Sequence, residues 1–515
     1  MNKAVNPILA GFYPDPSICA VGEDFYIVNS SFSYFPGLPI MHSKDLAHWE
    51  QIGNVLTRES QLPLGTEEIS RGLFAPTIRY NNGVFYVICT NVTKGGNFIV
   101  TSDKPEGPYS EPHYLEGADG IDPSLFFDED GKCYYIGTHP NPEGCKYDGD
   151  WYIYIQEVDI KNFKLICEPK NVWNGAMKGV HWPEGPHLYK IGEYYYILHA
   201  EGGTGPDHAI SVARSENVFG PYENNFKNPI FTHRHLGKEC PIKYVGHGDL
   251  VKTINDEWYI VCLGVRPTHG YTTMGRETFL AKVDFEDNWP VVNCGVGILT
   301  DTVDVNLDVF RPESGKNPVP NITKNYDFDE MDELTSDFLQ IRNPVKDSYK
   351  LTKDGLLLKF GKDELTDTNH PTFLGIRQDT KKFRFRSKLD VSNLNNGKRA
   401  GICIYQNSKF QLRFEATQKE VNIILVTDGQ EKEIDTYPIW GNMVSLCFIV
   451  SDLTASAMVK TEQGTKIIKE NIGLSALSTE VAGGFVGCTL GLYAVDTESK
   501  EDEYALFKYL SYERD

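Results

Sequence analysis

The feature that most constrains the fold of this chain is a strand motif that occurs five times before residue 260. Each copy consists of a short strand-like run, a polar turn and a second run rich in aromatic residues. The copies start at Pro16, Pro76, Pro123, Pro186 and Gly248, so successive starts are 60, 47, 63 and 62 residues apart. Five such units, each with room for about four strands, predict a five-bladed β-propeller, whereas a solenoid would need shorter and more regular repeats.

The register of the repeats predicts where a functional site lies. In a propeller, the innermost strands of all blades surround the central axis, so equivalent positions face one cavity. The residues just before each copy, together with the acid one place earlier in the fourth, are Asp15, Ala75, Asp122, Glu184, Gly185 and His247. Three carboxylic acids that are far apart in the sequence are therefore expected to converge.

A second domain is predicted after the propeller. Residues 1–312 are assigned to the propeller, residues 313–321 to a linker within a stretch rich in Pro, Gly, Asn and Ser, and residues 322–515 to the second domain. Apolar and polar residues alternate in Phe383–Val391 and in Phe410–Phe414, and Met443–Val450 resembles a more buried strand. These patterns predict a jelly-roll-like β-sandwich, so the whole chain is expected to be all-β.

The charge and the cysteines exclude several classes of protein. The formal net charge of −21 disfavours nucleic acid and anionic membranes as partners, because both attract positive surfaces. No stretch reaches the roughly 18 apolar residues of a membrane span, and the first residues lack the apolar run of a signal peptide. The 11 cysteines form no pattern with metal-ligand spacing. A cytoplasmic protein with reduced thiols and no required cofactor is predicted, and its oligomeric state stays open.

The three converging acids fit the chemistry of glycosidic bond cleavage. That reaction needs two carboxyl groups on opposite sides of the sugar, one of which protonates the leaving oxygen. The protonating group must keep its proton near neutral pH, so its pKa has to be raised by burial or by a nearby carboxylate. Three acids could supply a base, an acid and a group that tunes the pKa of the acid.

The motifs around these acids resemble glycoside hydrolase family 43, and in particular its two-domain β-xylosidases and α-L-arabinofuranosidases. The resemblance covers nearly the whole chain and is carried by Tyr13-Pro14-Asp15-Pro16-Ser17, Gly120-Ile121-Asp122-Pro123-Ser124, Trp182-Pro183-Glu184-Gly185-Pro186-His187, Gly246-His247-Gly248-Asp249-Leu250-Val251 and Gly275-Arg276-Glu277-Thr278-Phe279-Leu280. It implies that Asp15 is the general base, Asp122 the modulator of a pKa and Glu184 the general acid of an inverting mechanism.

The resemblance also implies roles for residues that bind the sugar. Arg276 would contact sugar hydroxyls, and Phe32 and Phe74 would be stacking platforms, with blade packing as their alternative role. Many β-xylosidase relatives have Trp where this chain has Phe74. His247 would lie on the propeller axis, where some relatives hold a hydrated calcium, so a water-mediated structural calcium or a purely structural histidine is expected there.

The second domain is similar to the sandwich of the same family through Tyr326-Asp327-Phe328-Asp329 and Pro371–Gln378. In such relatives a sandwich loop closes one side of the active site and leaves a short pocket. The expected function is exo-acting release of xylose from the non-reducing end of β-1,4-xylo-oligosaccharides, with α-L-arabinofuranose as a second released sugar. A dedicated α-L-arabinofuranosidase acting on arabinoxylan fragments is the alternative enzyme. A non-catalytic carbohydrate-binding propeller is disfavoured because all three acids are present.

Overall fold

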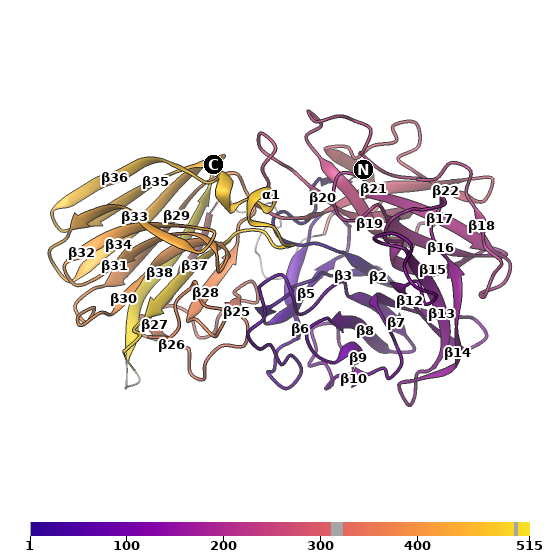
Figure 1. Cartoon of the computed structure of the whole chain (residues 1–515), viewed down its shortest axis with the longest axis horizontal. Coiled ribbons are helices and arrows are strands. Elements are labelled where there is room, and N and C mark those ends of the chain that lie inside the picture. Colours follow the sequence, from indigo (N-terminus) through magenta and orange to yellow (C-terminus); the bar gives the residue numbers. More distant parts are fainter. Residues whose placement is uncertain (1, 311–322, 499–502) are drawn as a thin grey trace.

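The computed structural model describes residues 2–310, 323–498 and 503–515. Figure 1 shows two lobes of strands side by side, the first formed by the N-terminal half of the chain and the second by the C-terminal half. Within the described residues, the only helices are the 3-10 turn η1 (Ser475–Leu477) and the short helix α1 (Thr479–Ala482), neither of which is long and apolar enough to cross a membrane. The predicted all-β class is confirmed.

The first lobe contains five four-stranded antiparallel sheets, each built from four strands in chain order. The first two blades consist of β2 (Ser17–Val21), β3 (Asp24–Val28), β5 (Gly37–Ser43) and β6 (Glu50–Leu56), and of β7 (Thr77–Asn81), β8 (Val84–Asn91), β9 (Gly96–Ser102) and β10 (His113–Tyr114). The third consists of β11 (Ile121–Phe127), β12 (Cys133–Pro140), β13 (Trp151–Asp159) and β14 (Lys164–Trp173). The last two consist of β15 (Glu184–Ile191), β16 (Tyr194–Glu201), β17 (Ala209–Ser215) and β18 (Glu223–Asn224), and of β19 (Lys243–Lys252), β20 (Trp258–Val265), β21 (Glu277–Glu286) and β22 (Trp289–Val292).

The first strands of the blades form a closed ring. Strand β2 contacts β7, β7 contacts β11, β11 contacts β15, β15 contacts β19, and β19 returns to β2. Outside the blades, β1 (Asn2–Val5) pairs antiparallel with β23 (Thr302–Val305), which brings the start of the chain to the end of the propeller. The predicted five-bladed propeller is confirmed, and its first strands surround the axis.

The second lobe is a two-sheet sandwich. Its larger sheet contains β24 (Thr323–Asp327), β26 (Tyr349–Thr352), β27 (Gly355–Lys359), β29 (Lys382–Asp390), β34 (Met443–Ser451), β35 (Thr454–Thr461), β36 (Gly464–Gly473) and β38 (Tyr504–Arg514). Its smaller sheet contains β28 (Phe373–Arg377), β30 (Arg399–Asn407), β31 (Phe410–Ala416), β32 (Glu420–Thr427), β33 (Gln430–Pro438) and β37 (Thr489–Val495). The facing apolar side chains of both sheets form one core. The predicted linker 313–321 lies outside the described residues.

The alternation predicted for Phe410–Phe414 is only half realised. Every residue of β31 is buried, including the polar Gln411 and Arg413. Their face of the sheet also carries Cys403 and Tyr405, which pack in one cluster with apolar residues of the propeller. Because this sheet has the core on one face and the first lobe on the other, polar side chains in β31 do not indicate solvent exposure.

The two lobes are joined by backbone pairing as well as by packing. Strand β25 (Gln340–Ile341) of the second lobe pairs with β4 (Tyr34–Phe35) of the propeller. The next residue, Arg342, is fully buried and donates a hydrogen bond to the carbonyl oxygen of Glu67 in the propeller at 3.0 Å. These contacts fix the sandwich beside the ring of blades.

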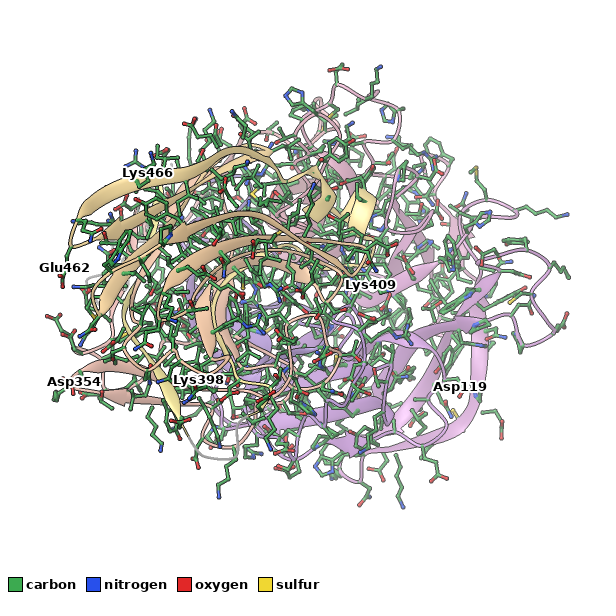
Figure 2. All side chains as sticks on the ribbon, turned by 60° about the vertical axis from the view of Figure 1, so that its left-hand side comes forward. Asp119, Asp354, Lys398, Lys409, Glu462 and Lys466 are labelled. Carbon is green, nitrogen blue, oxygen red and sulfur yellow. The ribbon has the colours of Figure 1, made fainter. Side chains whose placement is uncertain are left out.

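Charged side chains project from the outside of both lobes. Figure 2 shows Lys466, Glu462 and Asp119 at the periphery, and all three are exposed.

All 11 cysteines are free, and seven of them are buried.

Candidate active site

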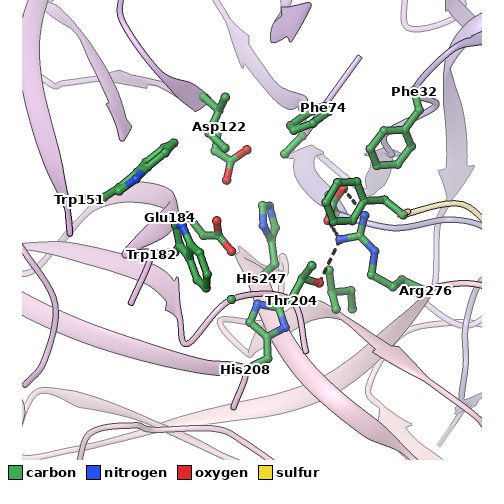
Figure 3. A pocket seen from close by; sticks show the side chains of 16 residues that line it. Phe32, Phe74, Asp122, Trp151, Trp182, Glu184, Thr204, His208, His247 and Arg276 are labelled. Atoms are coloured by element: carbon green, nitrogen blue, oxygen red, sulfur yellow. Dashed lines mark hydrogen bonds and ion pairs between the residues drawn. The ribbon is translucent and has the colours of Figure 1, made fainter. Parts of the chain in front are cut away.

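A pocket of about 340 Å³ opens where the first strands of the blades begin. All seven residues proposed from the sequence line it, and Figure 3 labels six of them around the pocket, all except Asp15. The seven are Asp15, Phe32, Phe74, Asp122, Glu184, His247 and Arg276. The convergence expected from the repeat register is therefore present in the structure.

A shared backbone conformation aims these side chains into the pocket. Asp15, Asp122, Gly185 and His247 occupy matched positions in four blades, and their φ angles are 50°, 53°, 55° and 45°. The left-handed region is costly for residues other than glycine, and such conformations cluster at functional sites. The pairing register also shifts at this point in β11, β15 and β19, which interrupts the ladder and redirects a side chain.

Asp15 is held as an ionised carboxylate. Its Oδ1 accepts a hydrogen bond from Nη1 of Arg276 at 2.7 Å, and its Oδ2 accepts one from Ser30 Oγ at 2.6 Å. Burial raises the pKa of Asp15. Arg276, His247 and Ser30 together lower it by more than burial raises it, so the net pKa lies below the ordinary value. An ionised, oriented carboxylate is what a general base requires.

Asp122 and Glu184 show the opposite behaviour. Burial raises the pKa of Asp122. The charge of His247 lowers this pKa and the negative charge of Asp15 raises it, and the resulting pKa is about 6. Burial, followed by the negative charges of Asp122 and Asp15, raises the pKa of Glu184 well above its ordinary value. Glu184 thus keeps its proton to a higher pH than Asp15 does, and such a separation of pKa values distinguishes an acid from a base.

Two roles are expected for Phe32, sugar stacking and packing, and its surroundings bear on the choice. Its ring packs nearly parallel to Phe12, with centroids 5.9 Å apart, and to Phe485, with centroids 5.8 Å apart. Only 2% of Phe32 is exposed, which favours the alternative role of packing within the pocket wall. Phe74 meets the edge of Phe32 and is partly exposed, so its ring remains available to a ligand.

The second lobe contributes Phe485 to the pocket. The amide of Phe485 donates to Ser70 Oγ at 2.9 Å, and neighbouring Gly484 approaches so closely that a Cβ there would lie 2.4 Å from the same oxygen. Gly487 packs equally closely on Met274. The sandwich loop expected to close one side of the site is therefore present, and its glycines permit the contact.

Sequence reasoning missed several residues of the pocket as ligand contacts, namely Trp151, Trp182, Thr204, His208 and Phe485. Trp182 stands two residues before Glu184 in a motif already singled out, and an aromatic residue among glycines could have pointed to Phe485. Trp151, Thr204 and His208 carry no comparable signal, because each enters the pocket from a segment that the repeat register does not align.

His247 lies in the pocket, stacked over the backbone of Gly185, where a Cβ would be 2.8 Å from the imidazole ring. Within the described ranges, no group of three or more His, Cys, Asp or Glu side chains is arranged to hold a metal ion. A calcium ion beside His247 would therefore have to take most of its ligands from water, as the sequence-based expectation requires.

Known proteins resemble both lobes. Residues 4–290 match the family model described as glycosyl hydrolases family 43, and residues 325–513 match the one described as beta xylosidase C-terminal Concanavalin A-like domain. A xylosidase/arabinosidase of Butyrivibrio fibrisolvens is 49% identical over 518 residues, which cover 99% of each chain.

Two further relatives extend the comparison. A non-reducing end alpha-L-arabinofuranosidase of Bacteroides ovatus is 35% identical over 506 residues, covering 95% of this chain and 90% of its own. The crystal structure of a xylan beta-1,4-xylosidase from Bacillus halodurans superposes with a TM-score of 0.90 at 32% identity, covering 99% of this chain and 100% of the other. By sequence and by structure along nearly its full length, the chain belongs to glycoside hydrolase family 43.

Proposed function

We propose that this glycoside hydrolase is an exo-acting, inverting enzyme that releases xylose from the non-reducing end of β-1,4-xylo-oligosaccharides and also releases α-L-arabinofuranose. The observation that carries the proposal is a single pocket in which the pKa of Asp15 is lowered and that of Glu184 is raised. The double name of the Butyrivibrio relative, xylosidase/arabinosidase, supports both released sugars.

In the proposed mechanism, each polar group of the pocket has its own step. Glu184 donates its proton to the glycosidic oxygen as the bond to the anomeric carbon breaks. Asp15 accepts a proton from the water that attacks the same carbon from the opposite face, so configuration inverts in one displacement. Arg276 keeps the Asp15 carboxylate oriented through a 2.7 Å hydrogen bond, and the charge of Asp122 favours the protonated form of Glu184.

The shape of the pocket supports exo action. At about 340 Å³ it lies near the lower end of small-molecule sites, and Phe485 of the sandwich forms part of its wall. A chain end fits such a pocket, whereas the interior of a long polysaccharide would need an open groove. Short oligosaccharides taken up into the cytoplasm are the substrates we propose.

A dedicated α-L-arabinofuranosidase is the second candidate. The specific observation in its favour is Phe74, which occupies a position where many β-xylosidase relatives have a larger Trp and which lines the pocket beside Phe32 and Phe485. The Bacteroides relative, which aligns with this chain over 90% of its own length, is named for arabinofuranosidase activity.

Two chromogenic substrates test the choice. The wild type and Asp15→Ala are assayed on 4-nitrophenyl β-D-xylopyranoside and 4-nitrophenyl α-L-arabinofuranoside, and NMR identifies the first anomer formed from the xyloside. We expect hydrolysis of both by the wild type, a faster reaction on the xyloside, and α-xylose as the first product. Activity on the arabinofuranoside alone would favour the second candidate. A folded wild type inactive on both would overturn the proposal, and β-xylose as first product would overturn inversion.

A further inference from the structure

The side of the pocket next to Glu184 is a wall of two tryptophans. Figure 3 shows Trp151 and Trp182 beside Glu184, across the pocket from Arg276. Because the general acid must stand next to the oxygen of the leaving group, this wall faces the departing sugar in the proposed reaction.

Backbone atoms of two neighbouring segments pack closely around Trp182. Its amide donates to the carbonyl oxygen of Gly149 at 2.8 Å. A Cβ on Gly149 would lie 2.9 Å from the indole, and a Cβ on Gly203 would lie 2.8 Å from it. Since neither glycine can carry a side chain without moving the indole, the position of Trp182 depends on where the segments around these glycines are anchored.

The end of β16 provides that anchor. Oε2 of Glu201, the last residue of this strand, accepts a hydrogen bond from the amide of Ala176 at 3.1 Å. The next residue, Gly202, donates its amide to the carbonyl oxygen of His181 at 2.8 Å. Gly203 then contacts Trp182, so consecutive residues of one segment hold the loop 174–182 at both ends.

Glu201 is a costly residue to place there. Only 1% of it is exposed, and the nearest basic side chain among the described residues with an ion-pair contact to it is His199, whose Nε2 lies 3.4 Å from Oε2. Oε1 has no hydrogen-bond partner among the described residues. Burial raises the pKa of Glu201, but the nearby His199, the Ala176 amide and Ser211 together lower it below the ordinary value, so the buried group is ionised. Burying a carboxylate that leaves one oxygen without a hydrogen bond costs stability, and such departures from the rules of a stable fold are expected at functional sites.

We infer that Glu201 is a positioning residue which, through the loop 174–182, holds Trp182 against the leaving sugar and thereby sets recognition of that sugar. The inference rests on the proposed function, because it assumes that Glu184 protonates a leaving sugar. It assigns no role to Glu201 in binding the sugar whose anomeric carbon reacts, since that sugar lies towards Asp15 and Arg276.

Two substrates separate this role from a general structural one. Xylobiose has a leaving sugar that would touch Trp182, whereas the fluoride of β-xylosyl fluoride is too small to do so. We expect Glu201→Ala to lower kcat/KM on xylobiose on the order of tenfold, mainly through KM, and to change kcat/KM on the fluoride less than about twofold. Glu201→Gln retains an oxygen for the Ala176 amide and should recover most of the loss.

Controls separate alternative causes. Glu193→Ala removes an exposed acid from the turn just before β16 and should leave both substrates unaffected. Trp182→Ala should reproduce the loss on xylobiose, and the double variant with Glu201→Ala should lose little more, because both act through one contact.

The outcomes are distinct. An equal loss on both substrates in Glu201→Ala, an unchanged KM for xylobiose, or failure of both Glu201 variants to fold would overturn the positioning role. A folded wild type that hydrolyses neither xylobiose nor the fluoride would instead count against the proposed function.

Discussion

The innermost strands of the propeller bury charged groups at two levels and treat them in opposite ways. The pocket level consists of Asp15, Asp122, Glu184 and His247, on these strands or just before them, together with Arg276, which precedes β21 in the fifth blade. The axial network lies on the same strands, mostly two or four residues further along, and consists of Ser17, Arg79, His187, Tyr189 and Asp249. In the first, carboxyl groups crowd together with one guanidinium, and in the second a single carboxylate is surrounded by donors.

Asp249 of the axial network is saturated with hydrogen bonds. Its Oδ2 accepts from Ser17 Oγ at 2.7 Å and from Arg79 Nη1 at 2.8 Å, and its Oδ1 accepts from the Tyr189 hydroxyl at 2.5 Å. Burial raises the pKa of Asp249, yet Arg79 and the other donors lower it to well below the ordinary value. These partners come from three other blades, so the network links four of the five blades of the ring.

The two levels differ in how many hydrogen-bond donors surround each buried carboxylate, and this number decides whether the charge is fixed. Where donors match the carboxylate, the charge is fixed and contributes to stability. Where three carboxyls lie near one Arg276, their pKa values move apart, and Glu184 holds its proton to a higher pH than Asp15. The same strands thus carry a reactive level and a structural level, and substitutions should separate the two.

The largest effect on rate is expected at Asp15. Asp15→Ala removes the group that activates water in the only chemical step, so kcat should fall on the order of 10³-fold or more on every substrate. Steady-state kinetics on xylobiose and on 4-nitrophenyl β-D-xylopyranoside check this. Near wild-type rates on either one would remove Asp15 from the role of base.

Glu184→Ala should produce a loss that depends on the leaving group. A sugar alcohol needs the proton of Glu184, whereas 4-nitrophenolate hardly does. Hydrolysis of xylobiose should therefore fall on the order of 10²-fold or more, with a much smaller loss on the nitrophenyl xyloside. Equal losses on both substrates would contradict the assignment of the acid.

Asp249→Asn should affect stability and spare the chemistry. Removing the charge of buried Asp249 opposite the partly buried Arg79 is expected to cost about 3–5 kcal/mol of unfolding free energy, measured by denaturant titration at pH 7. The folded-state pKa of Asp249 is lowered, so its contribution is present above the unfolded pKa of about 3.9 and is lost as pH falls towards the folded pKa. The difference from wild type should therefore narrow below about pH 4. A fall in kcat of the folded protein comparable to that of Asp15→Ala would erase the distinction between the levels.

Asp122→Asn should move one limb of the pH profile. The charge of Asp122 is the second cause, after burial, of the raised pKa of Glu184. Its removal lowers that pKa, so Glu184 loses its proton earlier and the alkaline limb of kcat/KM shifts to lower pH. A pH-rate profile on xylobiose measures the shift, and an unmoved limb would show that burial alone keeps Glu184 protonated.

The smallest effect is expected at Ser30. Its hydroxyl donates to Oδ2 of Asp15 at 2.6 Å and helps to lower the pKa of that group. Ser30→Ala should raise the pKa of Asp15, so the acidic limb of the profile moves to higher pH while kcat on the plateau changes little. Ser30→Thr, which keeps a hydroxyl, is the matched control. An unchanged acidic limb in Ser30→Ala would show that Arg276 and His247 account for the lowered pKa without it.

The sequence allowed the five blades and the three acids to be predicted, but not most of the aromatic residues that line the pocket. The blade count followed from repeated strand and turn patterns, and Asp15, Asp122 and His247 followed from their fixed place in those repeats. Phe485 and Trp151 were not identified, because they enter the pocket from outside the repeated register. The burial of Arg413 was also missed, since residue alternation reports one covered face of a sheet and not a second one.

By itself, the sequence determined the closed ring of five blades and the convergence of three acids, because strand periodicity and repeat spacing are local properties that propagate around an axis. The tertiary structure alone decided which acid keeps a proton, because the pKa values of Asp15 and Glu184 depend on burial and on charges that arrive from other blades. It also decided that Phe485 of the sandwich forms part of the pocket, since the close approach of Gly484 to Ser70 joins residues more than 400 positions apart.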